Sequence, residues 1–266
     1  MRSERDQRAI QVLLVAHEQH PLYGVRRLAL HLGWSQHKAR RIRSLAGITI
    51  IRPTKKRRYG STPAEILAAP NALKRFAHLR NGDRPQDGLS YADMVDSGGW
   101  VQDFTYLWFQ RSWHYLAVVL DLKTRQILGW RLGLRHSSEL THAALLDALV
   151  RYPAPTILHS DQGSEYLSYK HQLTCDQYEI TLSSSDKASP WQNGFMERFF
   201  GSFKPELGRL TQYQDIGQLY EAIALTVHYY NHERIHLALK MSPAAYAASL
   251  MLAPMERDKV SGEVGA

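Results

Sequence analysis

The first part of the chain carries its apolar residues at helical spacing. Residues 5–20 have one apolar face, which predicts a helix. Residues 23–46 then hold two short helical patterns, divided by a turn that contains Gly33. Ser35 is a suitable N-cap for the second helix and Gly47 a suitable stop. A helix, a glycine-containing turn and a second helix are typical of a helix-turn-helix.

From Trp100 onward the hydrophobic pattern is that of strands. WVQDFTYLWF, WHYLAVVLDL and RQILGWRLGL are three β-rich runs with short gaps, which predicts an antiparallel meander. Next come an amphipathic helix (SSELTHAALLDALVRY), a short buried strand (TILHSD), a helix over residues 164–178 and a strand (EITLSS). This order is typical of an α/β, ribonuclease-H-like fold, a mixed sheet flanked by helices. Helices are also predicted at 190–207 and 215–231, with a short one after Pro243.

The composition divides the chain into four parts. A break between 61 and 99 contains one expected helix, from Pro63 to Leu79, and then a Gly-, Asp- and Pro-rich linker. We therefore expect a small all-helical N-terminal module at 1–60, a helix and linker at 61–99, a catalytic core at 100–247 and a tail at 248–266.

The charge is concentrated at the front of the chain. Residues 1–60 contain 14 Lys or Arg and 3 Asp or Glu, a net charge of +11, whereas the whole chain carries +8. Such a distribution indicates a polyanionic partner, although charge alone fits a solvated surface equally well. The second helix of the turn motif would point Lys38 and Arg41 outward, and a basic arm follows it. This arm, suited to phosphates or a minor groove, contains Lys55, Lys56, Arg57 and Arg58. The alternative is a small helical bundle with a charged surface.

Other features restrict the class of protein. Hydrophobic residues make up 44% and charged residues 22% of the chain, as in ordinary globular proteins. We expect no membrane span and no signal peptide, hence a cytoplasmic protein. Cys175 is the single cysteine, which rules out an internal disulfide. His228, His232 and His236 have metal-ligand spacing, but without a nearby cysteine we do not expect zinc.

Three carboxylates are candidates for chemistry. Asp103 lies inside the first strand, Asp161 ends the TILHSD strand, and Glu197 lies in the early turns of a helix. Each alone fits a solvated or capping role, but the predicted fold brings the two aspartates side by side and a helix brings the glutamate. Clustered carboxylates repel each other, and hard divalent cations remove that penalty. Two metals about 4 Å apart can drive in-line phosphoryl displacement.

Several segments together resemble a known family. They are HPLYGVRRL, WVQDFTYL, YLAVVLDLKTRQILGW, LHSDQGSEY, SPWQNGFMERFFGSFKPEL and YNHERIHLALKMSPAAY. The chain resembles bacterial insertion-sequence transposases with a retroviral-integrase-like core, specifically the downstream-frame product of the insertion sequence three group. The resemblance runs from about His20 to Ala247. Thirty-five residues separate Asp161 from Glu197, which is the spacing of that family.

The resemblance implies roles for individual residues. The three carboxylates would form the catalytic triad and hold two Mg²⁺ ions, for which Mn²⁺ could substitute. Lys204, two helical turns beyond Glu197, would contact DNA near the reacting phosphate. Gln192 and Asn193 would position that helix or touch DNA, and a helix-capping role is equally open. His159, just before the second aspartate, is expected to be structural.

The implied function is DNA transposition, by metal-dependent strand cleavage and strand transfer at insertion-sequence ends. The expected partners are double-stranded DNA at element ends and target, further copies of the chain on that DNA, and an upstream-frame protein. A bacterial, nucleoid-associated location would follow. Two alternatives stay open: a non-catalytic DNA-binding regulator derived from a transposase, and a nuclease without joining activity. The segment GDRPQDGLSYADMVDSGG is longer and more acidic than the connection usual in the family.

Overall fold

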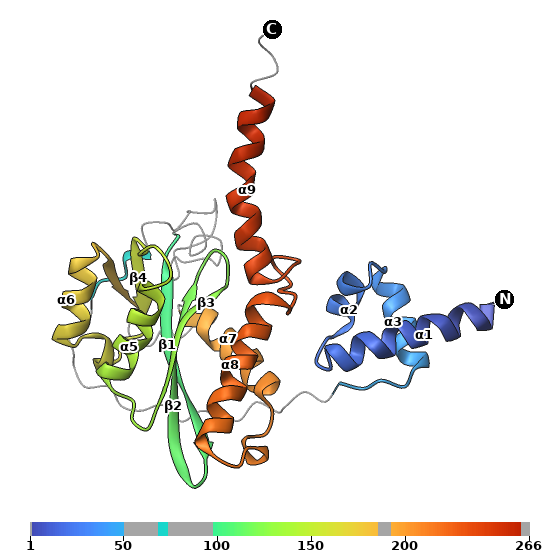
Figure 1. Cartoon of the computed structure of the whole chain (residues 1–266), viewed down its shortest axis with the longest axis horizontal. Coiled ribbons are helices and arrows are strands. Elements are labelled where there is room, and N and C mark those ends of the chain that lie inside the picture. The colour runs from blue at the N-terminus through green and yellow to red at the C-terminus, as the bar shows by residue number, and fades with distance from the viewer. Residues whose placement is uncertain (1, 51–68, 74–97, 186–192, 262–266) are drawn as a thin grey trace, which may run out of the picture. The chain divides into compact units, whose positions relative to one another are not determined.

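A computed structural model of the chain describes residues 2–50, 69–73, 98–185 and 193–261. Its contacts divide the chain into two compact units, Met1–Arg57 with His228–Ala266, and Arg58–Val227. Figure 1 labels the elements of both. Five residues predicted to contact DNA lie outside the described residues. They are Gln192 and the basic arm of Lys55, Lys56, Arg57 and Arg58.

The second unit is built on a five-stranded mixed sheet. The strand order is β3-β2-β1-β4-β5, in which β1, β2 and β3 are antiparallel neighbours and β4 and β5 run parallel to β1. The predicted meander and the two later strands are thereby confirmed. The bounds are β1 Trp100–Phe109, β2 Ser112–Asp121, β3 Ile127–Gly133, β4 Ile157–Ser160 and β5 Thr181–Ser184.

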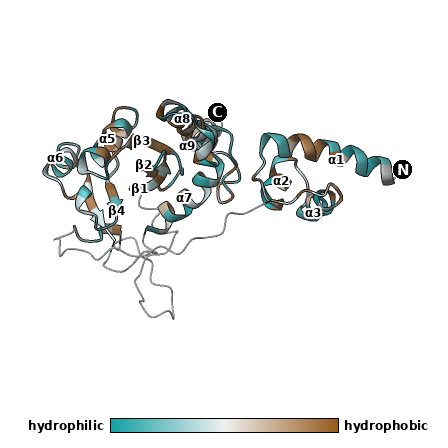
Figure 2. Cartoon of the chain, turned by 90° about the horizontal axis from the view of Figure 1, so that it is seen from below, coloured by the Kyte–Doolittle hydropathy of each residue, from teal (hydrophilic) through white to brown (hydrophobic). Residues whose placement is uncertain are grey.

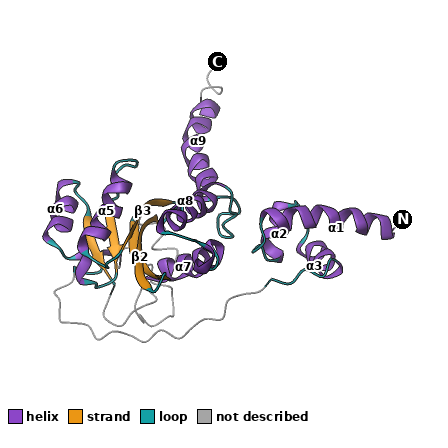
Figure 3. Cartoon of the chain, turned by 60° about the horizontal axis from the view of Figure 1, so that its bottom comes forward, coloured by secondary structure: helices purple, strands orange, loops and turns teal. Residues whose placement is uncertain are grey.

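Helices cover both faces of this sheet, as the fold prediction requires. Figures 2 and 3 show α5 (Ser138–Leu149) and α6 (Tyr169–Gln177) on one side, and α7 (Gly194–Leu207) and α8 (Ile216–His232) on the other. The helix predicted from residue 164 begins later. A 3-10 turn occupies Ser164–Tyr166, and α6 starts after Ser168, whose hydroxyl accepts a hydrogen bond from His171 N.

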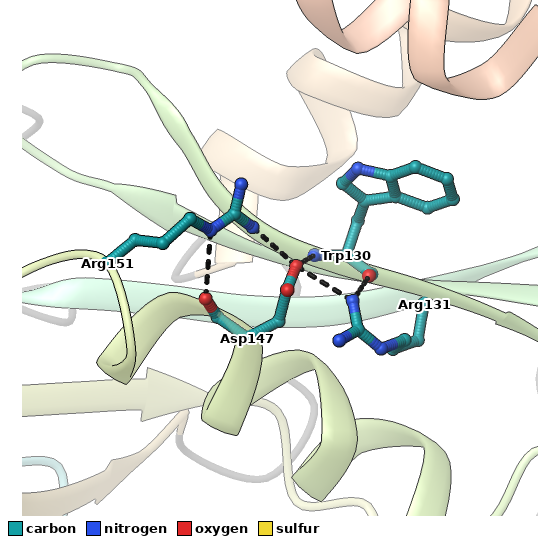
Figure 4. A network of polar contacts seen from close by, with 4 residues as sticks. All are labelled: Trp130, Arg131, Asp147 and Arg151. Carbon is teal, nitrogen blue, oxygen red and sulfur yellow. Dashed lines mark hydrogen bonds and ion pairs between the residues drawn. The ribbon is translucent and has the colours of Figure 1, made fainter.

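Helix α5 packs closely against β3 on the face of the sheet that α5 and α6 cover. An ideal Cβ on Gly129 would lie 2.2 Å from the carbonyl oxygen of Ala144, so only glycine allows this approach. A polar network fastens the same two elements (Figure 4). The Asp147 carboxylate accepts from the backbone N–H of Trp130 at 3.2 Å and pairs with Arg131 at 2.9 Å and Arg151 at 2.5 Å. The core strand and helix therefore have a fixed spacing.

The predicted helix from Pro63 to Leu79 is wrong where it can be compared. Residues 69–71 are loop, and Ala72 and Leu73 are 3-10 rather than α-helix. Asn71 explains this, because its side-chain oxygen accepts the N–H of Leu73 at 3.2 Å and stabilises a turn. Leu73 is fully buried, and the N–H of Ala72 donates to the Ser183 hydroxyl of β5.

The first unit contains the predicted helix-turn-helix. Helices α1 (Arg2–Gln19), α2 (Val25–His31) and α3 (Gln36–Leu45) pack around Leu13, Leu28 and Ile42, which are fully buried. Ser35 caps α3, since its hydroxyl accepts from Lys38 N at 3.2 Å. Gly47, at φ +67°, ends it in the left-handed conformation that favours glycine. The helical prediction for this region is confirmed.

The far end of the sequence completes this first unit. The Tyr23 hydroxyl accepts from Ile235 N at 2.7 Å, and Arg27 Nε donates to the Ile235 carbonyl at 2.9 Å. His20 Nδ1 lies 3.0 Å from the Tyr229 hydroxyl. These contacts, here called the terminal latch, join α1 and α2 to residues more than 200 positions away.

The helix after Pro243 is longer than expected. It was predicted to be short, but α9 spans Pro243–Ser261, 19 residues. Its first half, AAYAASLMLA, is rich in strong helix formers, which allows continuation. Among the described residues, no helix is long and apolar enough to cross a membrane.

Candidate active site and nucleic-acid interface

The two candidate aspartates meet at one point of the sheet. Strands β1 and β4 are parallel, with Trp100 opposite Leu158 and Val101 opposite His159. Two residues further, the same register brings Asp103 level with Asp161, where β4 has just ended. Side chains two residues apart share a face, so both carboxylates point to the same side. The juxtaposition predicted for these two acids follows from the strand order and register.

Each aspartate is held by hydrogen bonds. Asp103 accepts from the backbone N–H of Phe104 at 2.8 Å and from the side-chain amide of Asn193 at 3.1 Å. Asp161 accepts from the N–H of Gly163 at 3.0 Å. His159, whose ring nitrogens lie 2.9 and 3.1 Å from the Ser183 and Ser185 hydroxyls, fastens β4 to the residues of β5 and beyond.

The site concentrates negative charge in a partly buried place. Burial raises the pKa of Asp161, and the Gly163 N–H opposes this only in part. Burial, and then the charge of Asp161, raises the pKa of Glu165 as well. The pKa of Tyr166 lies well above its usual value because the phenol is fully buried and faces the charges of Asp103, Asp161 and Glu165. A cation would relieve each of these costs.

Glu197 lies on the helix that borders these acids. Its helix, α7, begins at Gly194 after Asn193, and the Asn193 amide reaches Asp103 instead of capping the helix. Phe195, Phe199 and other apolar residues of α7 are buried, whereas Glu197 is exposed. The amphipathic pattern thus leaves the glutamate on the open side.

Among the described residues, no three His, Cys, Asp or Glu side chains are close enough together to hold a metal ion. Glu197 is therefore not gathered with Asp103 and Asp161 in this structure. Glu197 lies four residues beyond Asn193, about 6 Å further along the helix axis, and the Asn193 amide contacts Asp103. Carboxylate oxygens are the donors that Mg²⁺ prefers, so the residues present fit such an ion.

Lys204 follows on the same helix and is half-buried. Its Nζ donates to the carbonyl oxygen of Tyr106 at 2.8 Å, three residues along β1 from Asp103. The lysine therefore lies beside the strand that carries the first aspartate. Its contact with DNA stays a prediction.

Lys38 and Arg41, which were predicted to contact DNA, both interact with neighbouring side chains of the helix-turn-helix. Arg41 forms a bidentate pair with Asp6, at 2.7 and 2.8 Å, and the Lys38 ammonium lies 4.1 Å from the Trp34 ring centre. Both side chains thus have partners within the module. Their role in DNA contact stays a prediction.

Four arginines instead line a groove of about 540 Å³, together with Leu237 from the far end of the sequence. This arginine groove consists of Arg26, Arg27, Arg40 and Arg43. Among the described residues, Arg26 and Arg40 have no ion-pair partner, whereas Arg27 belongs to the terminal latch. The groove could not be predicted from the sequence, because its residues come from two helices and a distant loop. Glu165 was not predicted either, since its only signal was an acid four positions after Asp161.

Comparison with known proteins agrees with this geometry. A family model described as "Integrase core domain" matches residues 96–190, and a second model with the same description matches residues 178–243. The chain is similar to the "Insertion element IS600 uncharacterized 31 kDa protein" of Shigella sonnei, with 31% identity over 92% of this chain and 89% of that protein. It is also similar to the "Putative transposase InsK for insertion sequence element IS150" of Escherichia coli (strain K12), with 30% identity over 87% and 80% respectively.

Among solved structures, a chain of the simian T-cell lymphotropic virus intasome in complex with PP2A regulatory subunit B56 gamma superposes with a TM-score of 0.50. The identity is 19%, over 87% of this chain and 72% of that one, which supports the fold alone. The mixed sheet and its helices define a ribonuclease-H-like integrase core. The chain itself belongs to the family of insertion-sequence transposases with such a core.

Proposed function

We propose that this transposase cuts DNA at the ends of an insertion sequence and joins the freed 3′ ends to target DNA by metal-dependent phosphoryl transfer. One observation carries the proposal. The parallel register of β1 and β4 aligns Asp103 with Asp161, and the Asn193 amide brings the start of α7 to the same carboxylate. Two partly buried carboxylates side by side repel each other, and a bound divalent cation would offset that cost.

Asp103, Asp161 and Glu197 would hold two Mg²⁺ ions, or Mn²⁺ in their place. When bound, such ions neutralise the phosphate and lower the pKa of an attacking water or hydroxyl. The contribution of the chain is to keep both aspartates in register and to offer their carboxylates hydrogen bonds from Phe104, Asn193 and Gly163. Asn193 positions α7 beside Asp103 until Glu197 engages. Lys204, anchored near Asp103 through the Tyr106 carbonyl, offers a positive charge to a phosphate passing along β1.

The arginine groove would bind the DNA backbone at the element ends. Arg26 and Arg40 are exposed, and the groove lies on the helix-turn-helix surface together with the loop that contains Leu237. Backbone contacts of this kind release counterions, so binding should weaken steeply as salt rises. An element has two ends, so the active form would be an oligomer of this chain on DNA. An upstream-frame protein would be a further partner.

A strand-transfer assay tests the proposal. Labelled duplexes carrying the element's own terminal repeat are incubated with the full chain and Mg²⁺ or Mn²⁺, and cleaved and joined products are separated on a gel. We expect both products from the native chain and neither from Asp161→Asn, with DNA binding retained. Asp176→Asn, at an exposed aspartate of α6, is the matched control and should behave as the native chain.

Two results would contradict the proposal. Cleavage without joining would indicate a nuclease, and binding without either product would indicate a regulator. Joining by Asp161→Asn at the native rate would overturn the assignment of this residue.

A further inference from the structure

The β1–β2 hairpin carries a row of aromatic side chains on the face that α5 covers only in part. Phe104 and Tyr115 are partly buried against the core beneath α5. Beyond them Tyr106, Trp108 and Trp113 are about half exposed, at 49%, 53% and 50%. Figure 1 shows the hairpin extending past the end of α5. We call these three uncovered residues the aromatic stripe.

The rings of the stripe form one continuous array. Tyr106 pairs with Tyr115 and Trp108 with Trp113 across the two strands, so all four lie on the same face. Ring centres are 5.9 Å apart for Tyr106 and Trp113 and 4.9 Å apart for Trp108 and Trp113, at interplanar angles of 84° and 63°. Edge-to-face contact leaves ring faces open to further stacking. Single exposed apolar side chains are common on protein surfaces, whereas three adjoining ones form a patch that indicates a binding surface.

The stripe adjoins the candidate active site. Tyr106 is three residues beyond Asp103 on β1, and after burial and Tyr115, the charges of Glu165, Asp103 and Asp161 raise the pKa of its phenol. Strand β4 pairs with β1 only at Trp100 and Val101, and β3 pairs with β2 as far as Tyr115, so among the described strands the hairpin is a two-stranded ribbon beyond Tyr106. Lys204 contacts the β1 edge at the Tyr106 carbonyl. Asp103 and Tyr106 point to opposite faces of β1, so a DNA strand bound at the two aspartates would meet the stripe after crossing this edge of the strand.

Two arginines near the stripe supply positive charge for a nucleic acid. Arg111 lies at the tip of the hairpin, and Arg135 follows the end of β3 opposite Tyr115. Both are exposed and have no ion-pair partner in the described part of the chain. His136 stacks on Phe104 with ring centres 5.8 Å apart. Aromatic platforms between positive charges are the usual means of binding single-stranded nucleic acid without sequence preference.

We propose that the aromatic stripe stacks the bases of an unpaired DNA strand adjoining the reacting phosphate. The inference rests on the proposed function for the presence of DNA at Asp103 and Asp161, but base stacking is a separate property. Duplex ends must open for bases to reach Tyr106, Trp108 and Trp113, so the stripe would favour frayed ends. The same chemistry serves a 3′ overhang or a 5′ overhang, and the experiment distinguishes them.

Stacking can be measured without catalysis. The full chain is mixed in EDTA with duplexes that carry either a 3′ or a 5′ single-stranded overhang of about six nucleotides, a length within the site sizes of single-strand binders. 2-Aminopurine replaces successive overhang bases, because its fluorescence falls when it stacks on an aromatic ring. We expect quenching on one overhang, and the polarity of that overhang identifies the strand.

The double variant Trp108→Ala/Trp113→Ala should lose this quenching and bind the overhang duplex about tenfold or more weakly. Affinity for blunt duplex should change little. The double variant Trp108→Phe/Trp113→Phe keeps two rings and should retain most of the quenching, which separates lost stacking from lost folding. Tyr169→Ala, at an exposed aromatic of α6, is the matched control and should behave as the native chain.

Several results would overturn the inference. Native quenching in the double alanine variant, or no quenching on either overhang, would show that the stripe does not stack bases. A stripe that joins two copies of the chain would reveal itself by a smaller oligomer in the variant with unchanged overhang binding. If the native chain quenches 2-aminopurine but never joins DNA, the proposed function is refuted and this inference stands. If it joins DNA without quenching, this inference is refuted and the proposed function stands.

Discussion

Replacing Asp161 by Asn should have opposite effects on stability with and without metal. Side chains on one face of neighbouring strands are about 5 Å apart, and two unit charges at that distance repel by about 3 kcal/mol at an effective dielectric near 20. Asp161 retains some exposure, so water and salt reduce the recoverable part to about 1 kcal/mol. Asn keeps an oxygen for the Gly163 N–H. In EDTA the variant should therefore melt about 2–4 °C above the native chain.

Divalent metal should reverse that order. With about 10 mM Mg²⁺ and a dissociation constant of about 1 mM, the native chain gains about 1.4 kcal/mol, and the variant, which lacks one ligand, gains little. The pH dependence has a definite sign. Burial raises the pKa of Asp161 in the folded state, so its destabilising contribution is complete above that pKa and disappears as the pH falls through it. The difference in melting temperature between the variant and the native chain in EDTA should therefore shrink as the pH falls.

Differential scanning fluorimetry in EDTA and in Mg²⁺, repeated from pH 8 down to about pH 4 where an ordinary aspartate titrates, measures all of these effects. Asp176→Asn should show neither the gain in EDTA nor the loss of the metal response. A variant that is less stable than the native chain in EDTA, or one stabilised by Mg²⁺ as strongly, would refute the electrostatic reasoning.

Three further predictions concern other parts of the molecule. In a salt titration, Arg26→Ala/Arg40→Ala should bind duplex DNA more weakly, and the slope of log K against log salt should decrease in magnitude by about 2. Arg41→Ala should mainly lower the melting temperature, because Arg41 pairs with Asp6. Gly129→Ala should cost about 3 kcal/mol in urea unfolding, because its Cβ meets the α5 backbone, and a cost below 1 kcal/mol would contradict this packing. Asp147→Ala should cost about 1–2 kcal/mol, since Trp130 N–H loses its acceptor, and an unchanged urea midpoint would contradict this role.

The strands were predictable because their side chains alternate between the two faces of the sheet. The first run, Trp100–Phe109, matches β1 at both ends. Helix boundaries were less predictable where a cap or a turn decides them. Ser168 delays α6, and Asn71 bends a segment whose composition suggested a helix. Such local hydrogen bonds compete with the helix and are not visible in the hydrophobic pattern.

The site was partly predictable for a similar reason. Asp103 and Asp161 were expected side by side because strand order alone sets their alignment. Glu165 was missed because its proximity depends on how the loop after β4 folds back. The partner of Arg41 was missed because Asp6 lies 35 residues earlier, and no periodic pattern connects the two. Pairings of this kind depend on tertiary packing.

The terminal latch also bears on the order in which the protein is made. A ribosome releases α1, α2 and α3 first. Tyr229 and Ile235, which His20 and Tyr23 contact, emerge about 200 residues later. The arginine groove proposed to bind DNA is thus complete only after Leu237 has been made. Prematurely terminated chains would lack it, and so would be poor competitors for the element's ends.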